Sequence, residues 1–117
     1  MKRFGLALAI VIIALQAPTA ARGDEASQKC DVGPITRTYG NAPWLVYSCR
    51  DRHSILIVSA PGNAAMPAFF VFHPRGEGYE LRNQGSANQA ISAAAYAELS
   101  RLSPKQIADL IAATEAQ

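Results

Sequence analysis

The segment SILIVSA at residues 54–60 is flanked by two further apolar runs, WLVYSC at 44–49 and AFFVFH at 68–73. Each run has the length and the β-branched or aromatic content of a strand. Turn-forming residues separate the runs, with RDRH at 50–53 and PGN at 61–63. Because short connections favour antiparallel pairing of consecutive strands, the three runs predict the centre of an antiparallel sheet.

Two weaker strands are predicted outside these three. Residues 35–39 (ITRTY) are rich in β-branched side chains and stop at the breaker GNAP, residues 40–43. Residues 79–83 (YELRN) follow the turn sequence PRGEG at 74–78 and predict a fourth hairpin-linked or edge strand. The expected sheet is a mainly antiparallel meander of three to five strands.

The pattern changes to that of a helix between Ala87 and Leu102. There the apolar residues recur at steps of four, four and three, at Ile91, Ala95, Leu99 and Leu102. This spacing is typical of one face of an amphipathic helix.

A second helix is predicted directly afterwards. Ser103 is placed as its N-cap, Pro104 as its first residue and Gln106 as the partner in a capping box. Its apolar stripe consists of Ile107, Leu110, Ile111 and Thr114. The predicted fold class is therefore α+β: a small antiparallel meander followed by two C-terminal amphipathic helices.

Both faces of the three central strands are apolar. Ile55 and Ile57 point to one side of their strand, while Leu56 and Val58 point to the other. Such two-sided strands are typical of a sheet covered on both faces. Two helices cover only one face, so we expect the N-terminal segment to cover the other. A partner protein or a second copy of the chain is the alternative.

The first 23 residues have the pattern of a cleaved signal peptide. Lys2 and Arg3 precede twelve uncharged apolar residues, 4–15, and a small-residue region follows with Pro18. A transmembrane anchor would need about 20 apolar residues. We expect cleavage within Ala20 to Gly23, export to the periplasm or medium without a stable membrane anchor, and one small domain at 24–117.

Charge and cysteine content fit that interpretation. The full chain carries 11 Lys+Arg and 9 Asp+Glu, and removal of the leader leaves eight basic and nine acidic residues. No basic cluster remains that would bind nucleic acid. Cys30 and Cys49 are the only cysteines, and an even count in an exported domain predicts a structural disulfide.

Catalytic and metal motifs are weak. Asp51 and His53, with Ser48, Ser54 or Ser59, have the residue types of a nucleophilic hydrolase, but no G-x-S-x-G motif accompanies them. We expect a solvated turn histidine there, and we keep a small hydrolase as an alternative. The sequence has no metal-ligand spacing, and we expect no metal and no cofactor.

The uncharged loop PGNAAMP, residues 61–67, is the candidate contact site. Exposure of its side chains would favour partner binding, whereas burial would indicate packing at the end of the sheet, which we expect. The residues singled out are Pro61, Gly62, Asn63, Met66 and Pro67.

Tyr47-Ser48-Cys49, in an exported and disulfide-bonded β-rich domain, resembles the periplasmic inhibitors of C-type lysozymes. The resemblance covers only these residues, and it ends where two helices replace the family's C-terminal pattern. It implies, as an alternative, an inhibitor of an envelope or foreign hydrolase. From the residues themselves we expect an exported, non-catalytic binding domain, with an envelope protein or a second copy as partner.

Overall fold

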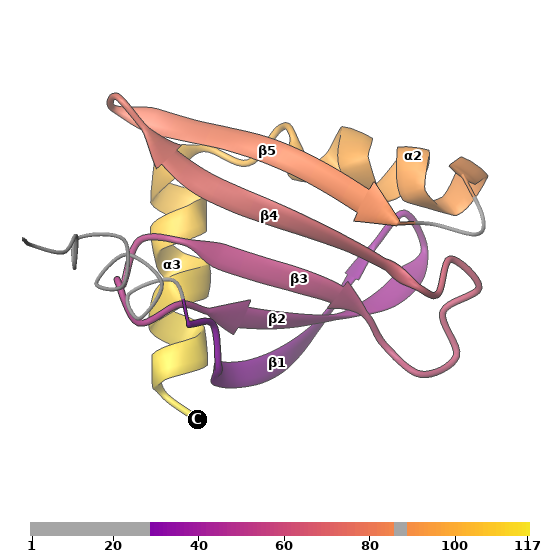
Figure 1. Cartoon of the computed structure of the whole chain (residues 1–117), viewed down its shortest axis with the longest axis horizontal. Coiled ribbons are helices and arrows are strands. Elements are labelled where there is room, and N and C mark those ends of the chain that lie inside the picture. The colour runs from indigo at the N-terminus through magenta and orange to yellow at the C-terminus, as the bar shows by residue number, and fades with distance from the viewer. Residues whose placement is uncertain (1–28, 86–88) are drawn as a thin grey trace, which may run out of the picture.

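The computed structural model describes residues 29–85 and 89–117 (Figure 1). The predicted leader and its cleavage site lie outside these residues. Five strands form one antiparallel sheet in the order β1-β2-β3-β4-β5, and two helices follow. The elements are β1 (Val32–Tyr39), β2 (Ala42–Ser48), β3 (Ile55–Ser59), β4 (Ala68–Arg75), β5 (Gly78–Gly85), α2 (Gln89–Leu99) and α3 (Pro104–Glu115). The predicted fold class is confirmed.

The β1–β2 hairpin has a two-residue turn, because Tyr39 pairs with Ala42. Gly40 and Asn41 both have positive φ, at 59° and 61°, as a type I′ turn requires. Gly40 also lies against α2: a Cβ atom added there would be 2.6 Å from the backbone nitrogen of Ala95. The turn geometry and the close approach of the helix therefore both require glycine.

The two helices pack on the same face of the sheet (Figure 1). The predicted first helix extends too far, since α2 ends at Leu99 and Leu102 lies in the connection to α3. The second helix begins as predicted. The Ser103 hydroxyl accepts from the Gln106 amide at 3.1 Å, and the Gln106 side chain accepts from the Ser103 amide at 2.8 Å.

The core lies between the sheet and the helices, with Trp44 at its centre. Trp44 is fully buried, its ring lies 5.1 Å from that of Phe70, and its indole N–H donates to the carbonyl of Tyr39 at 3.0 Å. The other large contributors alternate along the strands or follow the helical stripes: Val46, Ile55, Ile57, Phe72, Leu99, Ile107, Leu110 and Ile111.

Candidate functional site

The sheet face opposite the helices carries six apolar side chains, which we call the open face. They lie on the three central strands: Leu45 and Tyr47 on β2, Leu56 and Val58 on β3, Phe69 and Val71 on β4. All six are half-buried, whereas their neighbours along each strand are buried in the core. The predicted division of the strands into two apolar faces is therefore present.

Strand register places the open face in two rows. Leu45 pairs with Val58 and Val58 with Phe69, which gives one row across three strands. Tyr47, Leu56 and Val71 form the second row by the same pairings. Within residues 29–85 and 89–117, no helix or strand lies over these rows (Figure 1). From Lys29 onward the N-terminal segment enters the sheet as edge strand β1, and it does not form the expected cover there.

Polar residues border the open face on the two outer strands. Thr36 lies opposite Leu45 on β1, while Gln84 and Arg82 lie opposite Phe69 and Val71 on β5. The face is therefore an apolar centre between two polar edges. This arrangement is common for protein-binding surfaces, which have a more apolar core and a polar rim.

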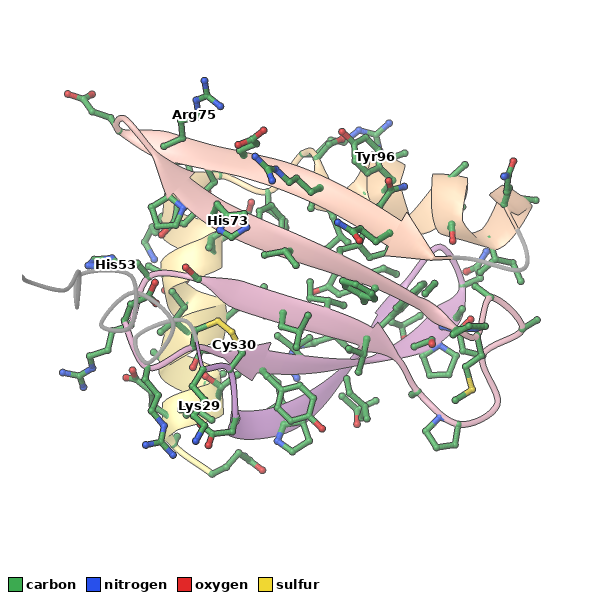
Figure 2. The ribbon with its side chains drawn as sticks, in the orientation of Figure 1. Lys29, Cys30, His53, His73, Arg75 and Tyr96 are labelled. Atoms are coloured by element: carbon green, nitrogen blue, oxygen red, sulfur yellow. A yellow bond between two sulfur atoms is a disulfide. The ribbon has the colours of Figure 1, made fainter. Side chains whose placement is uncertain are left out.

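A charge cluster occupies the β4–β5 end of this border. Glu80 accepts from Arg75 at 3.2 Å and from Arg82 at 3.3 Å. The hydrogen bond from Arg82, followed by the one from Arg75, holds the pKa of Glu80 below its usual value. His73 pairs with Glu80 across the strands and lies with Arg75 at the same end of β4 (Figure 2). Glu77 is exposed at the turn between β4 and β5.

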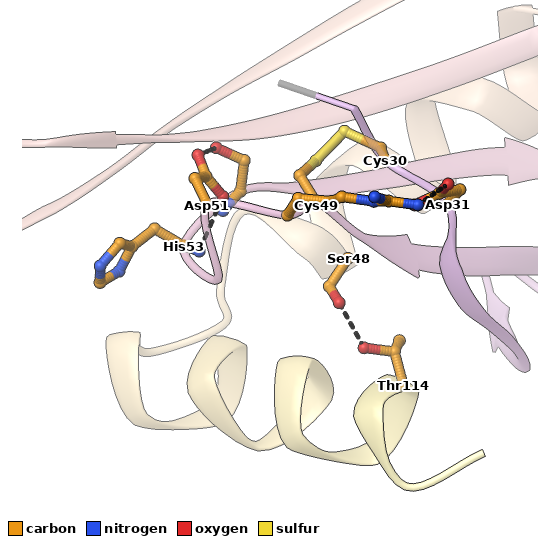
Figure 3. The surroundings of a disulfide bond; sticks show 9 residues. Cys30, Asp31, Ser48, Cys49, Asp51, His53 and Thr114 are labelled. Carbon is orange, nitrogen blue, oxygen red and sulfur yellow. Dashed lines mark hydrogen bonds and ion pairs between the residues drawn. A yellow bond between two sulfur atoms is a disulfide. The ribbon is translucent and has the colours of Figure 1, made fainter. Parts of the chain in front are cut away.

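The predicted disulfide joins Cys30 to Cys49, with α-carbons well inside the limit of about 7 Å for a bridge. It ties the residues before β1 to the end of β2 (Figure 3). Next to it, Asp31 accepts two hydrogen bonds from Arg50, from Nε at 2.9 Å and from Nη2 at 2.7 Å. The Arg50 hydrogen bond lowers the pKa of the Asp31 carboxyl and raises that of the guanidinium.

The Asp51–His53 turn is organised differently from a nucleophilic site. Asp51 Oδ1 accepts from the backbone amides of His53 and Ser54, at 2.8 and 2.9 Å, and its Oδ2 accepts from the Ser54 hydroxyl at 2.7 Å. The imidazole of His53 points away from the carboxylate (Figure 3). Burial raises the pKa of Asp51, but the hydrogen bonds from Ser54 and the amide of His53 outweigh it, so the net direction is downward. The carboxylate thus holds the turn closed.

The other two candidate serines also have structural contacts. Ser48 is fully buried, and its hydroxyl is hydrogen-bonded to that of Thr114 on α3 at 2.6 Å. Ser59 is buried and its hydroxyl accepts from the Ala68 amide at 3.3 Å. The structure therefore joins Asp51 and Ser54 by a hydrogen bond, whereas the hydroxyls of Ser48 and Ser59 bond to other residues.

The loop 61–67 combines packing with exposure. The buried Asn63 donates to the carbonyl of Pro43 at 2.7 Å and accepts from the amide of Ala65 at 2.8 Å, which fixes the loop to β2. Pro61, Gly62 and Pro67 are exposed, and Met66 is 49% exposed. Packing and exposure are thus properties of different residues in the same loop.

Within residues 29–85 and 89–117, no cluster of three or more His, Cys, Asp or Glu side chains is arranged to hold a metal ion. No helix in that part of the chain has the length and apolarity needed to span a bilayer.

The ion pairs at Asp31 and Glu80 were not anticipated. Glu80 and Arg82 are two residues apart in a predicted strand, so period-two alternation would have placed them on one face. The Asp31–Arg50 pair had no local signal, since 19 positions separate its residues.

Comparisons of the chain with protein-family models, curated proteins and solved structures found no match.

Proposed function

We propose that this protein is an exported, non-catalytic binding domain that holds a partner protein on the open face. The observation that carries the proposal is the pair of apolar rows on β2, β3 and β4, over which no described helix or strand lies. Burial of a large apolar side chain stabilises by about 1.5–3 kcal/mol, so covering six of them would favour association. Contiguous apolar patches on small domains often mark interaction sites.

Export is supported by two independent features. The N-terminal order of charged, apolar and small residues is typical of a signal peptide, and Cys30 and Cys49 are bonded. Disulfides persist mainly in oxidising compartments. The intact mass of the secreted protein tests cleavage: loss of about the first 20–23 residues supports export, and a full-length soluble protein contradicts cleavage.

The hydrogen bonds made by the candidate catalytic residues favour a binding function over hydrolysis. The Asp51 carboxylate accepts directly from the Ser54 hydroxyl, without the His53 imidazole between them. A hydrolytic set needs the base hydrogen-bonded to the nucleophile and oriented by the acid. In this turn the acid instead satisfies two backbone amides and one buried hydroxyl.

The experiment compares three forms of the mature protein as immobilised bait in envelope extract. Wild type is expected to retain a stoichiometric partner. Val58→Lys places a charge in the centre of the open face and is expected to lose that partner. Ala112→Lys adds the same charge at an exposed position on α3 and is expected to retain it. Circular dichroism is used to check that all three are folded, and equal retention by the three forms would contradict the proposal.

A further inference from the structure

Strand β5 is the outer strand of the sheet, and its free edge is regular. Its pairing with β4 runs without interruption from Ala68–Gly85 to Arg75–Gly78. The strand contains no proline. No strand in the described part of the chain pairs with its outer side. A long, regular edge of this kind presents backbone donors and acceptors that can pair with another strand.

The opposite edge, formed by β1, is protected. Pro34 lies within β1, and the register shifts between Val32 and Ile35. Proline and irregular pairing are devices that block edge-to-edge association. Because β1 has these devices and β5 lacks proline and a register shift, β5 is the edge available for pairing.

The sequence of β5 is complementary to itself. Suppose that two β5 strands pair antiparallel with Leu81 opposite Leu81. The residue before Leu81 in one copy then lies opposite the residue after it in the other, so Glu80 of each copy lies opposite Arg82 of the other. Both charges are on the open-face side of the strand, whereas Leu81 and Tyr79 are on the helix side. Opposite charges directly across a strand pair stabilise it, and like charges destabilise it.

The helix side of β5 has room for an apolar contact. A groove of about 210 Å³ lies between β5 and the helices, lined mainly by Phe72, Tyr79, Leu81, Leu99, Leu102 and Ile107. In the same register Leu81 meets Leu81 of the second copy at the border of this groove. Charged pairs on one face and an apolar contact on the other would then fix a single register.

We propose that two copies of this chain join through antiparallel pairing of their β5 strands about a two-fold axis at Leu81. The pairing makes one ten-stranded sheet, with both pairs of helices on one side and both open faces on the other. The interface is isologous, as in most two-fold dimers. The proposal rests on the β5 edge and does not require that the open face binds a partner.

Charge reversal tests the register by measurement of molar mass over a range of concentrations of the mature protein. Wild type is expected to dimerise. Glu80→Arg and Arg82→Glu each put like charges opposite one another at both symmetry-related 80–82 pairs. Each variant is expected to raise the dissociation constant of the dimer by about tenfold or more. The double variant Glu80→Arg/Arg82→Glu restores opposite charges and is expected to regain most of the affinity. Arg101→Glu, outside the sheet, is the control and is expected to dimerise like wild type.

Mixing the two single variants gives the sharpest result. A Glu80→Arg chain and an Arg82→Glu chain have complementary edges, so they are expected to form a heterodimer although each pairs poorly with itself. A general loss of folding would not produce this rescue. A monomeric wild type at all concentrations overturns the proposal and leaves the edge to an extended segment of another protein. A dimer that all the variants form equally well also overturns it.

Discussion

Asp31 and Arg50 each follow one cysteine of the disulfide, and their side chains form a two-point ion pair with N–O distances of 2.9 and 2.7 Å. The Arg50 amide also donates to the Lys29 carbonyl at 2.8 Å. The segment that leads into β1 is therefore held to the end of β2 by a covalent bond, an ion pair and a backbone hydrogen bond. Among these the covalent bond is expected to dominate, because exposed ion pairs contribute little.

Reduction of the disulfide is expected to lower the melting temperature strongly. For cysteines 19 positions apart, the chain-entropy model gives about 3 kcal/mol, or roughly 10 °C or more for a domain of this size. The comparison is a thermal melt with and without reductant. Arg50→Ala removes only the ion pair and is expected to lower the melting temperature much less. A larger decrease for Arg50→Ala than for reduction would contradict the expectation that the disulfide dominates.

Acid is expected to weaken the Asp51 turn. Since the pKa of Asp51 is lowered in the folded protein, its contribution is fully present above the unfolded value of about 4 and is lost as pH falls through the folded value. The stability difference between wild type and Asp51→Asn should therefore be largest near neutral pH and shrink in acid. His53→Ala is the control, since its exposed ring does not hold the turn. A difference that is constant from pH 7 to pH 2 would contradict the prediction.

Gly40→Ala is expected to be strongly destabilising, by about 2–4 kcal/mol from backbone strain and from displacement of α2. Gly76→Ala is a matched control, because Gly76 has nearly the same φ, 60° against 59°, but no atom within 4 Å of an added Cβ. The control measures strain alone. The free energy of unfolding is measured in urea. Equal losses in the two variants would contradict the prediction, because the close approach of Gly40 to Ala95 would then add nothing to the backbone strain.

The buried hydroxyl pair Ser48–Thr114 links β2 to α3, and it is expected to behave as a unit. Thr114 donates to the carbonyl of Ile111 at 2.6 Å, so its single proton is used and Ser48 is the donor between the hydroxyls. Ser48→Ala or Thr114→Val alone is expected to lower the free energy of unfolding by about 1–3 kcal/mol. The double variant should lower it by less than the sum of the two single losses. Additive losses in a double-mutant cycle would contradict the coupling.

The strands and the second helix could be predicted because local rules decide them. Alternation placed Ile55 and Ile57 on one face of β3, and Ser103 with Gln106 marked the start of α3. The first helix was predicted to extend to Leu102 because Leu102 continues the apolar period. In the structure, the Ser100 amide still donates a helical hydrogen bond to the Tyr96 carbonyl. The amides of Arg101 and Leu102 donate instead to carbonyls only three residues back, and the helix ends at Leu99.

The candidate site was less predictable, since it depends on register and turn geometry. Sequence could place Asp51, His53 and Ser54 in one turn, but not determine that the carboxylate bonds the hydroxyl directly. Likewise, two apolar faces could be read from the strands, whereas which face the helices cover depends on how they pack. The pairing of Asp31 with Arg50 follows from the β1–β2 register and the disulfide.

Site-specific photo-crosslinking tests the binding role of the open face most directly. A photoreactive amino acid in place of Val58 lies in the centre of the open face, and one in place of Ala112 lies on the exposed side of α3. Irradiation of exporting cells is expected to give a defined product with another envelope protein from position 58 and none from position 112. The absence of a product at 58, or the same products from both positions, would contradict the proposed binding surface.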